Sequence, residues 1–225
     1  MMSSIEWDEN NVPLSTRFDD PYYSKLSGRE ETRHVFIKGN HLSTRFAAAK
    51  NFHIAELGFG TGLNFLETAS HWKKHAASKA RLTFTSFELY PLDKEDMSRA
   101  LQPWPDLKAL SAPFIKAINI MEGWQEVVSD TVTLRLAIGD ANQRIHEMSE
   151  PADAWFLDGF SPAKNPELWN QGLMNAVGEN TKSDGTFATY TAAGWVRRMM
   201  EEAGFDVEKQ KGFGTKRHMS AGQRK

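Results

Sequence analysis

The chain has 225 residues, 40% of them hydrophobic and 25% charged, which is typical of a single globular α/β domain. It contains no cysteine, which excludes disulfides, thiolate metal centres and a cysteine nucleophile, and no metal is predicted. The net charge of −2 argues against a protein that coats nucleic acid, and the lack of a long apolar run or signal peptide predicts a cytoplasmic protein without membrane contact.

Residues 1–45 do not follow the strand–helix alternation of the later sequence, and we predict a small N-terminal extension there. Within it, Val35–Ile37 is expected to be a strand that turns at Gly39–Asn40 to form a hairpin. The extension would either cover the ligand edge of the sheet and grip the substrate or only close the sheet by packing. The main domain is predicted to span residues 46–225.

The segment Phe52–Asn64 predicts a buried strand that reaches Glu56 and turns through Gly58, Gly60 and Gly62 into a helix. Glycines let the backbone approach a ligand, and a helix N-terminus offers free amide groups. The glycine spacing differs from the G-x-G-x-x-G of dinucleotide sites, and Glu56 would repel a pyrophosphate. S-adenosylmethionine, which carries an ammonium and a sulfonium, suits this acidic turn better. An ordinary Gly-rich turn is the alternative.

Strands and helices alternate through the rest of the chain. Helices are predicted over residues 63–75, 93–101 and 194–203, with a further helical piece after the Pro103–Pro105 break. Strands are predicted over residues 82–88, 131–138, 153–157, 186–191, 205–211 and 216–221. With the first strand, this pattern predicts a mostly parallel seven-stranded sheet covered by helices, whose last two strands form an antiparallel edge hairpin.

Four predicted strands end in or beside an acidic residue: Glu56, Glu88, Asp140 and Asp158. Ligands of such sheets bind at the carboxyl ends of the strands, so we expect these acids to form one site. Glu88 would bind both hydroxyls of a ribose, and Asp140 would face the adenine amino group or its neighbouring amide. Glu56 would hold the methionyl end directly or through water. Each acid alone could instead cap a helix or face solvent.

The segment Asp158–Pro166 places a carboxylate, an aromatic ring and a stiff loop after a buried strand, which predicts an acceptor pocket. For an amine acceptor, Asp158 would aim the nitrogen lone pair at the methyl group while Phe160 packs against the incoming group. An alkyl amine has a pKa of about 10.4, so its deprotonation at pH 7 costs roughly 4 kcal/mol. A carboxylate of ordinary pKa is a weak base for this task, and we therefore favour orientation over proton abstraction. A loop packed for stability is the alternative.

The C-terminal tail is basic, since residues 209–225 contain six lysines and arginines and no acidic residue. Arg197 and Arg198 lie just upstream. Such a run is either a solvated tail or a patch that contacts phosphates.

These segments resemble the methyltransferase domain of the MnmC family. The matching motifs are Glu56–Phe65, Ser86–Glu88, Asp153–Pro166, Val196–Arg198 and Lys211–Arg217, with Glu30–Arg33 in the extension. The resemblance implies a Rossmann-like class I fold that uses S-adenosylmethionine to methylate the amine of 5-aminomethyl-2-thiouridine at the tRNA wobble position. The product would be 5-methylaminomethyl-2-thiouridine.

The predicted cofactor contacts are Glu56, Gly58, Phe59, Gly60, Thr61, Gly62, Asn64, Glu88, Asp140, Asp158 and Gly159, with Asp158 and Phe160 as the catalytic pair. The partner implied is the tRNA anticodon arm, whose phosphates need localised positive charge. The predicted substrate contacts are Lys164, Arg197, Arg198, Lys216 and Arg217, with Arg33 and Tyr22.

In many members of the family this domain is fused to a flavin-dependent oxidoreductase that exposes the amine. Here we expect that a separate flavin-dependent oxidoreductase supplies the amine or that the oxidase step is unnecessary. A methyltransferase for a small-molecule or protein amine would share every cofactor feature and is the main alternative. A noncatalytic nucleic-acid-binding module fits the four acids less well, and a nucleotide-dependent dehydrogenase does not fit the glycine spacing.

Overall fold

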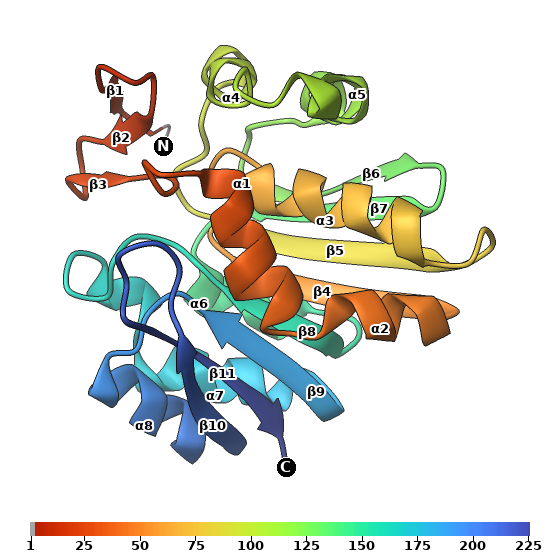
Figure 1. Ribbon diagram of the computed structural model, residues 1–225, viewed down its shortest axis with the longest axis vertical. Helices are drawn as coiled ribbons and strands as arrows, with labels where there is room; N and C mark the ends of the chain where they lie inside the picture. The colour runs from red at the N-terminus through yellow and green to blue at the C-terminus, as the bar shows by residue number, and fades with distance from the viewer. Residues whose placement is uncertain (1–2) are drawn as a thin grey trace.

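The computed structural model describes residues 3–225 and is built on one large sheet (Figure 1). Its strands are β4 (Asn51–Leu57), β5 (Arg81–Glu88), β6 (Gly123–Ser129), β7 (Val132–Ile138), β8 (Ala152–Leu157), β9 (Thr181–Thr189), β10 (Phe205–Lys211) and β11 (His218–Arg224). They form an eight-stranded sheet in the order β10-β11-β9-β8-β4-β5-β7-β6. The central strands β9, β8, β4, β5 and β7 are parallel, and β10, β11 and β6 are antiparallel to their neighbours.

The mostly parallel α/β fold and its antiparallel C-terminal edge hairpin are therefore confirmed, but the predicted seven strands were one too few. The additional strand is β6, which pairs with β7 at the opposite edge of the sheet. Its residues alternate between exposed and half-buried, and it carries Gln125 and Glu126. Pairing with β7 orders this segment, because its own sequence supplies few buried apolar residues.

Helices cover both faces of the sheet, and each face has its own hydrophobic core. One core includes residues of α2 (Leu42–Ala48), α3 (Leu63–His75), α4 (Lys94–Ala100) and α5 (Lys108–Ala117). The other includes residues of α6 (Ala141–Arg144), α7 (Gln171–Glu179) and α8 (Gly194–Glu202). Strand β8 supplies both cores, since Phe156 packs in the first and Trp155 in the second, as alternation along a strand requires. The helix predicted over residues 63–75 is confirmed residue for residue.

The hairpin predicted at Val35–Ile37 was wrong, because these residues are helical. Helix α1 (Gly28–Glu31) continues directly into a π-helix, η1 (Thr32–Lys38). The apolar residues of η1 are buried on the sheet, and the ring of Phe36 stacks on that of Phe156 with centroids 4.9 Å apart. Burial of these side chains against the sheet stabilises the helix and outweighs the β-propensity of the short run.

A hairpin does occur earlier in the extension, where β1 (Ile5–Trp7), β2 (Pro13–Ser15) and β3 (Asp20–Pro21) form a small antiparallel sheet. In Figure 1 these strands and the turn between β10 and β11 lie toward the same end of the large sheet. The division of the chain at residue 45 stays a prediction.

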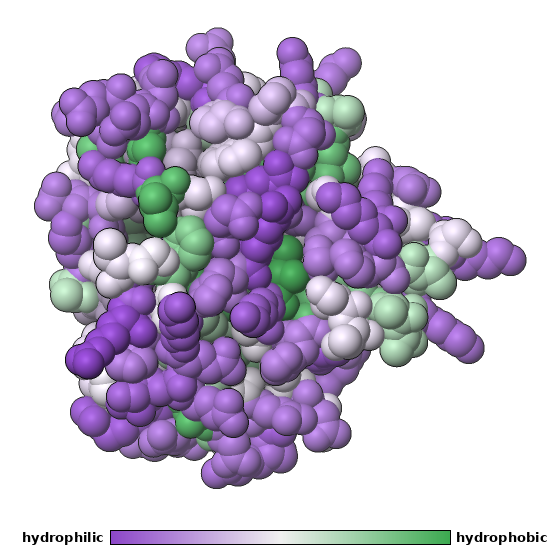
Figure 2. Space-filling model, viewed as in Figure 1, coloured by the Kyte–Doolittle hydropathy of each residue, from purple (hydrophilic) through white to green (hydrophobic). Residues whose placement is uncertain are grey.

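The remaining short helical turns are η2 (Pro105–Leu107), η3 (Ile145–Glu147) and η4 (Pro166–Leu168). Figure 2 shows that the face in view is mostly hydrophilic, with only small hydrophobic areas. Across residues 3–225, no helix is both long and apolar enough to cross a membrane. Nor do the same residues contain a group of three or more His, Asp or Glu side chains placed to hold a metal ion.

Candidate active site

A cavity of about 590 Å³ lies at the carboxyl ends of the central parallel strands. Its wall is formed by the loops that follow β4, β5, β7, β8 and β9, together with residues of the N-terminal extension and of the turn between β10 and β11. The cavity is thus at the edge of the sheet where the sequence placed the site.

The loop after β4 contacts the loop after β8 through two glycines. Gly58 has a φ of +88°, and a Cβ atom there would lie 3.1 Å from the backbone nitrogen of Gly159. A side chain at position 58 would therefore be strained by its backbone conformation and would push the two loops apart. The glycine turn and the Asp158 loop form one continuous wall because of this contact.

Glu88, at the end of β5, is held by the backbone at the cavity wall. Its carboxylate accepts hydrogen bonds from the N–H groups of Gly60, at 2.9 Å, and Tyr90, at 2.8 Å. Burial raises the pKa of Glu88, and these backbone hydrogen bonds act in the opposite direction. The free lone pairs of a carboxylate fixed in this way can accept hydrogen bonds from two hydroxyl groups.

Glu56 lies behind the cavity wall and does not line the cavity. It is fully buried, and its two oxygens accept hydrogen bonds from the Ser86 hydroxyl at 2.7 Å and the Asn64 amide at 2.9 Å. Burial raises its pKa well above the ordinary range. Asn64, the residue that donates to Glu56, does line the cavity, so the contact of Glu56 with the methionyl end, direct or through water, stays a prediction. The extension reaches this network because the Thr32 hydroxyl donates to the Asn64 amide oxygen at 2.6 Å.

Asp158, directly after β8, accepts a hydrogen bond from the same Asn64 amide at 2.7 Å. Burial raises the pKa of Asp158 to about 7, and the nearby negative charge of Glu31 acts in the same direction. A single amide group thus links two carboxylates, Glu56 in the core and Asp158 at the cavity. Asp158 can change its protonation state near neutral pH.

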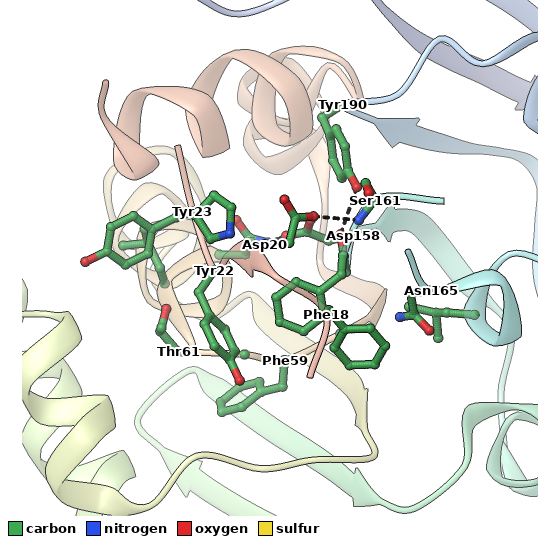
Figure 3. Close-up of a pocket in the computed structure, with 18 of the residues that line it drawn as sticks. Phe18, Asp20, Tyr22, Tyr23, Phe59, Thr61, Asp158, Ser161, Asn165 and Tyr190 are labelled. Carbon is green, nitrogen blue, oxygen red and sulfur yellow. Dashed lines mark hydrogen bonds between the residues drawn. The ribbon is translucent and has the colours of Figure 1, made fainter. Parts of the chain in front are cut away.

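Aromatic rings line the cavity next to Asp158 (Figure 3). The ring of Phe160 stacks on that of Phe18 with centroids 4.6 Å apart and meets Tyr22 edge-on at 5.0 Å. Tyr190 comes directly after β9, and its hydroxyl donates to the backbone oxygen of Gly159 at 2.9 Å. Such a pocket can hold a planar, largely apolar group beside a carboxylate.

Asp140 caps a helix, as one interpretation had it, while its contact with adenine stays a prediction. It lines the cavity, and it also caps α6 by accepting the N–H of Asn142 at 2.9 Å. Of the other predicted cofactor contacts, Gly58, Phe59, Gly60, Thr61, Asn64, Glu88, Asp158 and Gly159 line the cavity, whereas Glu56 and Gly62 do not.

Fewer of the predicted substrate contacts than of the predicted cofactor contacts lie at the cavity. Tyr22 and Lys216 line the cavity, but Arg33, Lys164, Arg197, Arg198 and Arg217 do not. Arg33 is paired with Glu67 and Glu30, each at 2.6 Å, and Lys164 with Asp19 at 2.9 Å. Arg198 and Arg217 are exposed.

Several cavity residues escaped the sequence analysis: Phe18, Asp20, Glu31, Thr32 and Tyr190. Asp20 accepts the N–H of Ser161 at 2.8 Å, which joins β3 to the Asp158 loop. Only Glu31 and Thr32 had a signal in the sequence, because they fall within the Glu30–Arg33 motif.

A family model described as S-adenosyl-L-methionine-dependent methyltransferase matches residues 106–225. The chain belongs to this family. Its cofactor is therefore S-adenosylmethionine, and the cavity offers the glycine turn and the acidic residues that such a cofactor needs. The Rossmann-like fold of this methyltransferase is confirmed by the crystal structure of MNMC2 from Aquifex aeolicus, which has a TM-score of 0.80, 24% identity and coverage of 98% of this chain and 70% of that one.

Curated relatives match the methyltransferase over nearly its whole length. It is 43% identical over 98% of its length to the tRNA 5-methylaminomethyl-2-thiouridine biosynthesis bifunctional protein MnmC of Pseudomonas fluorescens (strain Pf0-1) and covers 34% of that protein. It is 44% identical, again over 98%, to the protein of the same name from Marinomonas sp. (strain MWYL1) and covers 33% of it. The resemblance to the MnmC methyltransferase domain is thus confirmed. The chain spans about a third of the length of these relatives.

Proposed function

We propose that this methyltransferase transfers a methyl group from S-adenosylmethionine to the amine of 5-aminomethyl-2-thiouridine at the wobble position of tRNA, giving 5-methylaminomethyl-2-thiouridine. The proposal is supported by the names of relatives that match 98% of the chain. The structural observation that carries it is Asp158, a carboxyl with a pKa of about 7 placed between the glycine turn and an aromatic pocket. The alternative with a small-molecule or protein amine as acceptor has no observation that favours it.

The cofactor would be held by residues at the carboxyl ends of β4, β5 and β7 and at the start of α3. We assign the ribose hydroxyls to Glu88, the adenine edge to Asp140, and the methionyl end to Asn64 backed by Glu56. When bound, the cofactor supplies an electrophilic methyl group. The role of the protein is then to bring a neutral amine to that group with its lone pair in line.

Asp158 would accept the proton that the substrate ammonium must lose. An alkyl ammonium has a pKa of about 10.4, so transfer to a carboxylate of pKa 3.9 costs about 9 kcal/mol. For a carboxyl whose pKa is about 7, the cost falls to about 5 kcal/mol. The raised pKa of Asp158 therefore supports a larger part in proton acceptance than the sequence alone indicated, in addition to orientation of the amine.

The acceptor base would stack against the aromatic cluster of Phe160, Phe18 and Tyr22, because aromatic faces stack on nucleobases. We propose that the anticodon arm is then gripped by the basic residues predicted above, from the extension, the Asp158 loop, α8 and the C-terminal hairpin. The cytoplasm is the location we propose for such a tRNA-modifying enzyme. The relatives are named bifunctional, and we propose that a flavin-dependent oxidoreductase supplies the amine substrate.

The test is incubation of the protein with methyl-labelled S-adenosylmethionine and tRNA whose wobble uridine carries the free aminomethyl group. After digestion to nucleosides, we expect the label in 5-methylaminomethyl-2-thiouridine. Label in other nucleosides, or transfer only to free amines or proteins, would contradict the proposal. A tRNA that already carries the methylamino group serves as the control and should remain unlabelled.

A further inference from the structure

The chain binds one of its own ammonium groups inside the cavity. The Nζ atom of Lys216 lies 2.9 Å from Oε1 of Glu31 and 4.1 Å from the centroid of the Tyr190 ring. All three residues line the cavity. A carboxylate and an aromatic face are the two groups that together bind an alkyl ammonium, so this part of the cavity is built for a primary amine.

Glu31 is fixed independently of Lys216. Its other oxygen accepts the N–H of Ser24 at 3.2 Å, and its side chain is only 13% exposed. Tyr190 is likewise held in place by its hydrogen bond to the backbone of Gly159, the residue after Asp158. The carboxylate and the ring would therefore stay in position if Lys216 left.

Lys216, in contrast, is much more exposed than Glu31. It lies in the turn between β10 and β11, its side chain is 46% exposed, and its long stem can swing toward solvent without disturbing the core. If a substrate ammonium replaces the ammonium of Lys216, the half-buried carboxylate of Glu31 keeps a positively charged partner.

We propose that Glu31 and Tyr190 form the recognition site for the acceptor ammonium, and that Lys216 occupies this site until the aminomethyl group of the substrate displaces it. The inference rests on the proposed function in that the acceptor is a primary amine. Glu31 then binds the cation, and Asp158 in the same cavity receives its proton. Lys216, once displaced, is free to pair with a tRNA phosphate. This second role explains why a lysine predicted to contact the substrate lies at the cavity.

Such a site would select an amine over a hydroxyl acceptor. A hydroxyl group cannot replace the ammonium of Lys216 without leaving Glu31 as an unpaired, largely buried charge. Acceptors without a positive charge should therefore fail to open the site. Glu31 and Tyr190 are in this sense specificity-determining residues.

The experiment compares Glu31→Gln with Glu30→Gln, a matched control at the adjacent, exposed position of α1. With undermodified tRNA, we expect Glu31→Gln to raise KM at least tenfold, to change kcat less, and to leave S-adenosylmethionine binding unchanged by calorimetry. Glu30→Gln should behave as wild type in all three. A KM of Glu31→Gln within twofold of wild type would overturn the inference, while a wild-type protein that methylates no amine would overturn the proposed function instead.

A second variant, Lys216→Met, tests displacement directly and decides the matter if Glu31→Gln does not fold. The probe is the free nucleoside 5-aminomethyl-2-thiouridine, which has no phosphate for Lys216 to bind. We expect KM for this nucleoside to fall at least threefold, because no internal ammonium competes for Glu31. An unchanged or higher KM would show that Lys216 does not occupy the acceptor site.

Discussion

Three acidic residues from neighbouring strand ends, Glu56, Glu88 and Asp158, show how burial decides what a carboxyl group can do. Burial raises the pKa of all three, yet their hydrogen bonds differ. Glu56 is enclosed by side-chain donors, Glu88 is held by backbone amides, and Asp158 faces the cavity with one amide donor from Asn64. Asp158 lines the cavity, and burial raises its pKa to about 7, which suits a group that must exchange a proton.

Asp158→Asn is expected to lower kcat by about a hundredfold or more, because the amide cannot accept a proton. S-adenosylmethionine binding should change little, since the Asn64 hydrogen bond can be kept by the new amide oxygen. In the wild type, the rate should fall as the pH drops below about 7 and Asp158 becomes protonated, and this limb should be lost in the variant. Single-turnover rates over a range of pH, with calorimetry for the cofactor, provide the measurement. Unchanged turnover would remove Asp158 from the mechanism.

The same substitution is expected to stabilise the free protein at alkaline pH. The pKa of Asp158 is about 7 in the folded state against about 3.8 when unfolded, so the folded state holds more protons between these values. Stability from this group is therefore lost as the pH rises from about 4 to 7, and it stays lost above 7. Three pKa units would correspond to about 4 kcal/mol, but the carboxylate faces an open cavity, and we expect a gain of about 1 to 2 kcal/mol.

Unfolding midpoints of the wild type and Asp158→Asn at pH 5 and pH 8 test this prediction. The stability difference between the two proteins should be larger at pH 8. A difference that is equal at both pH values, or larger at pH 5, would show that Asp158 is not held protonated by the fold.

At the scale of elements, one buried carboxylate attaches α1 and η1 to α3. Glu67 of α3 accepts hydrogen bonds from Nε of Arg29 at 2.5 Å and Nε of Arg33 at 2.6 Å, and its side chain is 3% exposed. Arg33 was predicted to contact substrate, and in this structure its guanidinium binds Glu67. The attachment positions Glu31 and Thr32, which lie between the two arginines, at the cavity.

Glu67→Ala is expected to destabilise the protein by about 3 kcal/mol, because it leaves two arginines without their shared partner. Glu122→Ala is the control, since Glu122 is 79% exposed and pairs with Arg144 at the surface. The control should cost less than about 1 kcal/mol. Urea unfolding curves measure both. Equal effects of the two substitutions would mean that the Glu67 network contributes no more than a surface pair.

At the scale of the whole molecule, the N-terminal extension and the C-terminal hairpin meet at the cavity. The extension brings Phe18, Tyr22 and Glu31, and the C-terminal hairpin brings Lys216, which pairs with Glu31. In the proposed function, the loops of the central sheet hold the cofactor, and these terminal segments complete the acceptor side of the cavity. Arg198 of α8 and Arg217 of the C-terminal hairpin are exposed, and in the proposed function they contact the anticodon arm.

The affinity for tRNA is expected to fall steeply with salt. Each phosphate contact contributes roughly 0.7 to 0.9 to the slope of log affinity against log salt. The double variant Arg198→Ala and Arg217→Ala should therefore lower this slope by about 1 to 2. Arg81→Ala, at the start of β5 and so at the other end of the sheet, is the control and should leave the slope unchanged. Equal slopes for the wild type and the double variant would place the tRNA elsewhere.

The sequence by itself determined the fold class and the edge of the sheet at which the cavity lies. Strand periodicity fixed the order of the main elements, and the acids and glycines at strand ends marked the cavity, because chain direction alone brings the ends of parallel strands together. These are local signals, and they were sufficient to place Gly58, Glu88 and Asp158 at the cavity.

The tertiary structure decided everything that depends on packing between distant segments. The Val35–Ile37 run is helical because the sheet buries it, and Glu56 is withdrawn from the cavity because Asn64 and Ser86 enclose it. The pairing of Glu31 with Lys216 joins residues 185 positions apart in the chain. No local pattern encodes such a contact, since burial and charge pairing are properties of the folded neighbourhood and not of the residue.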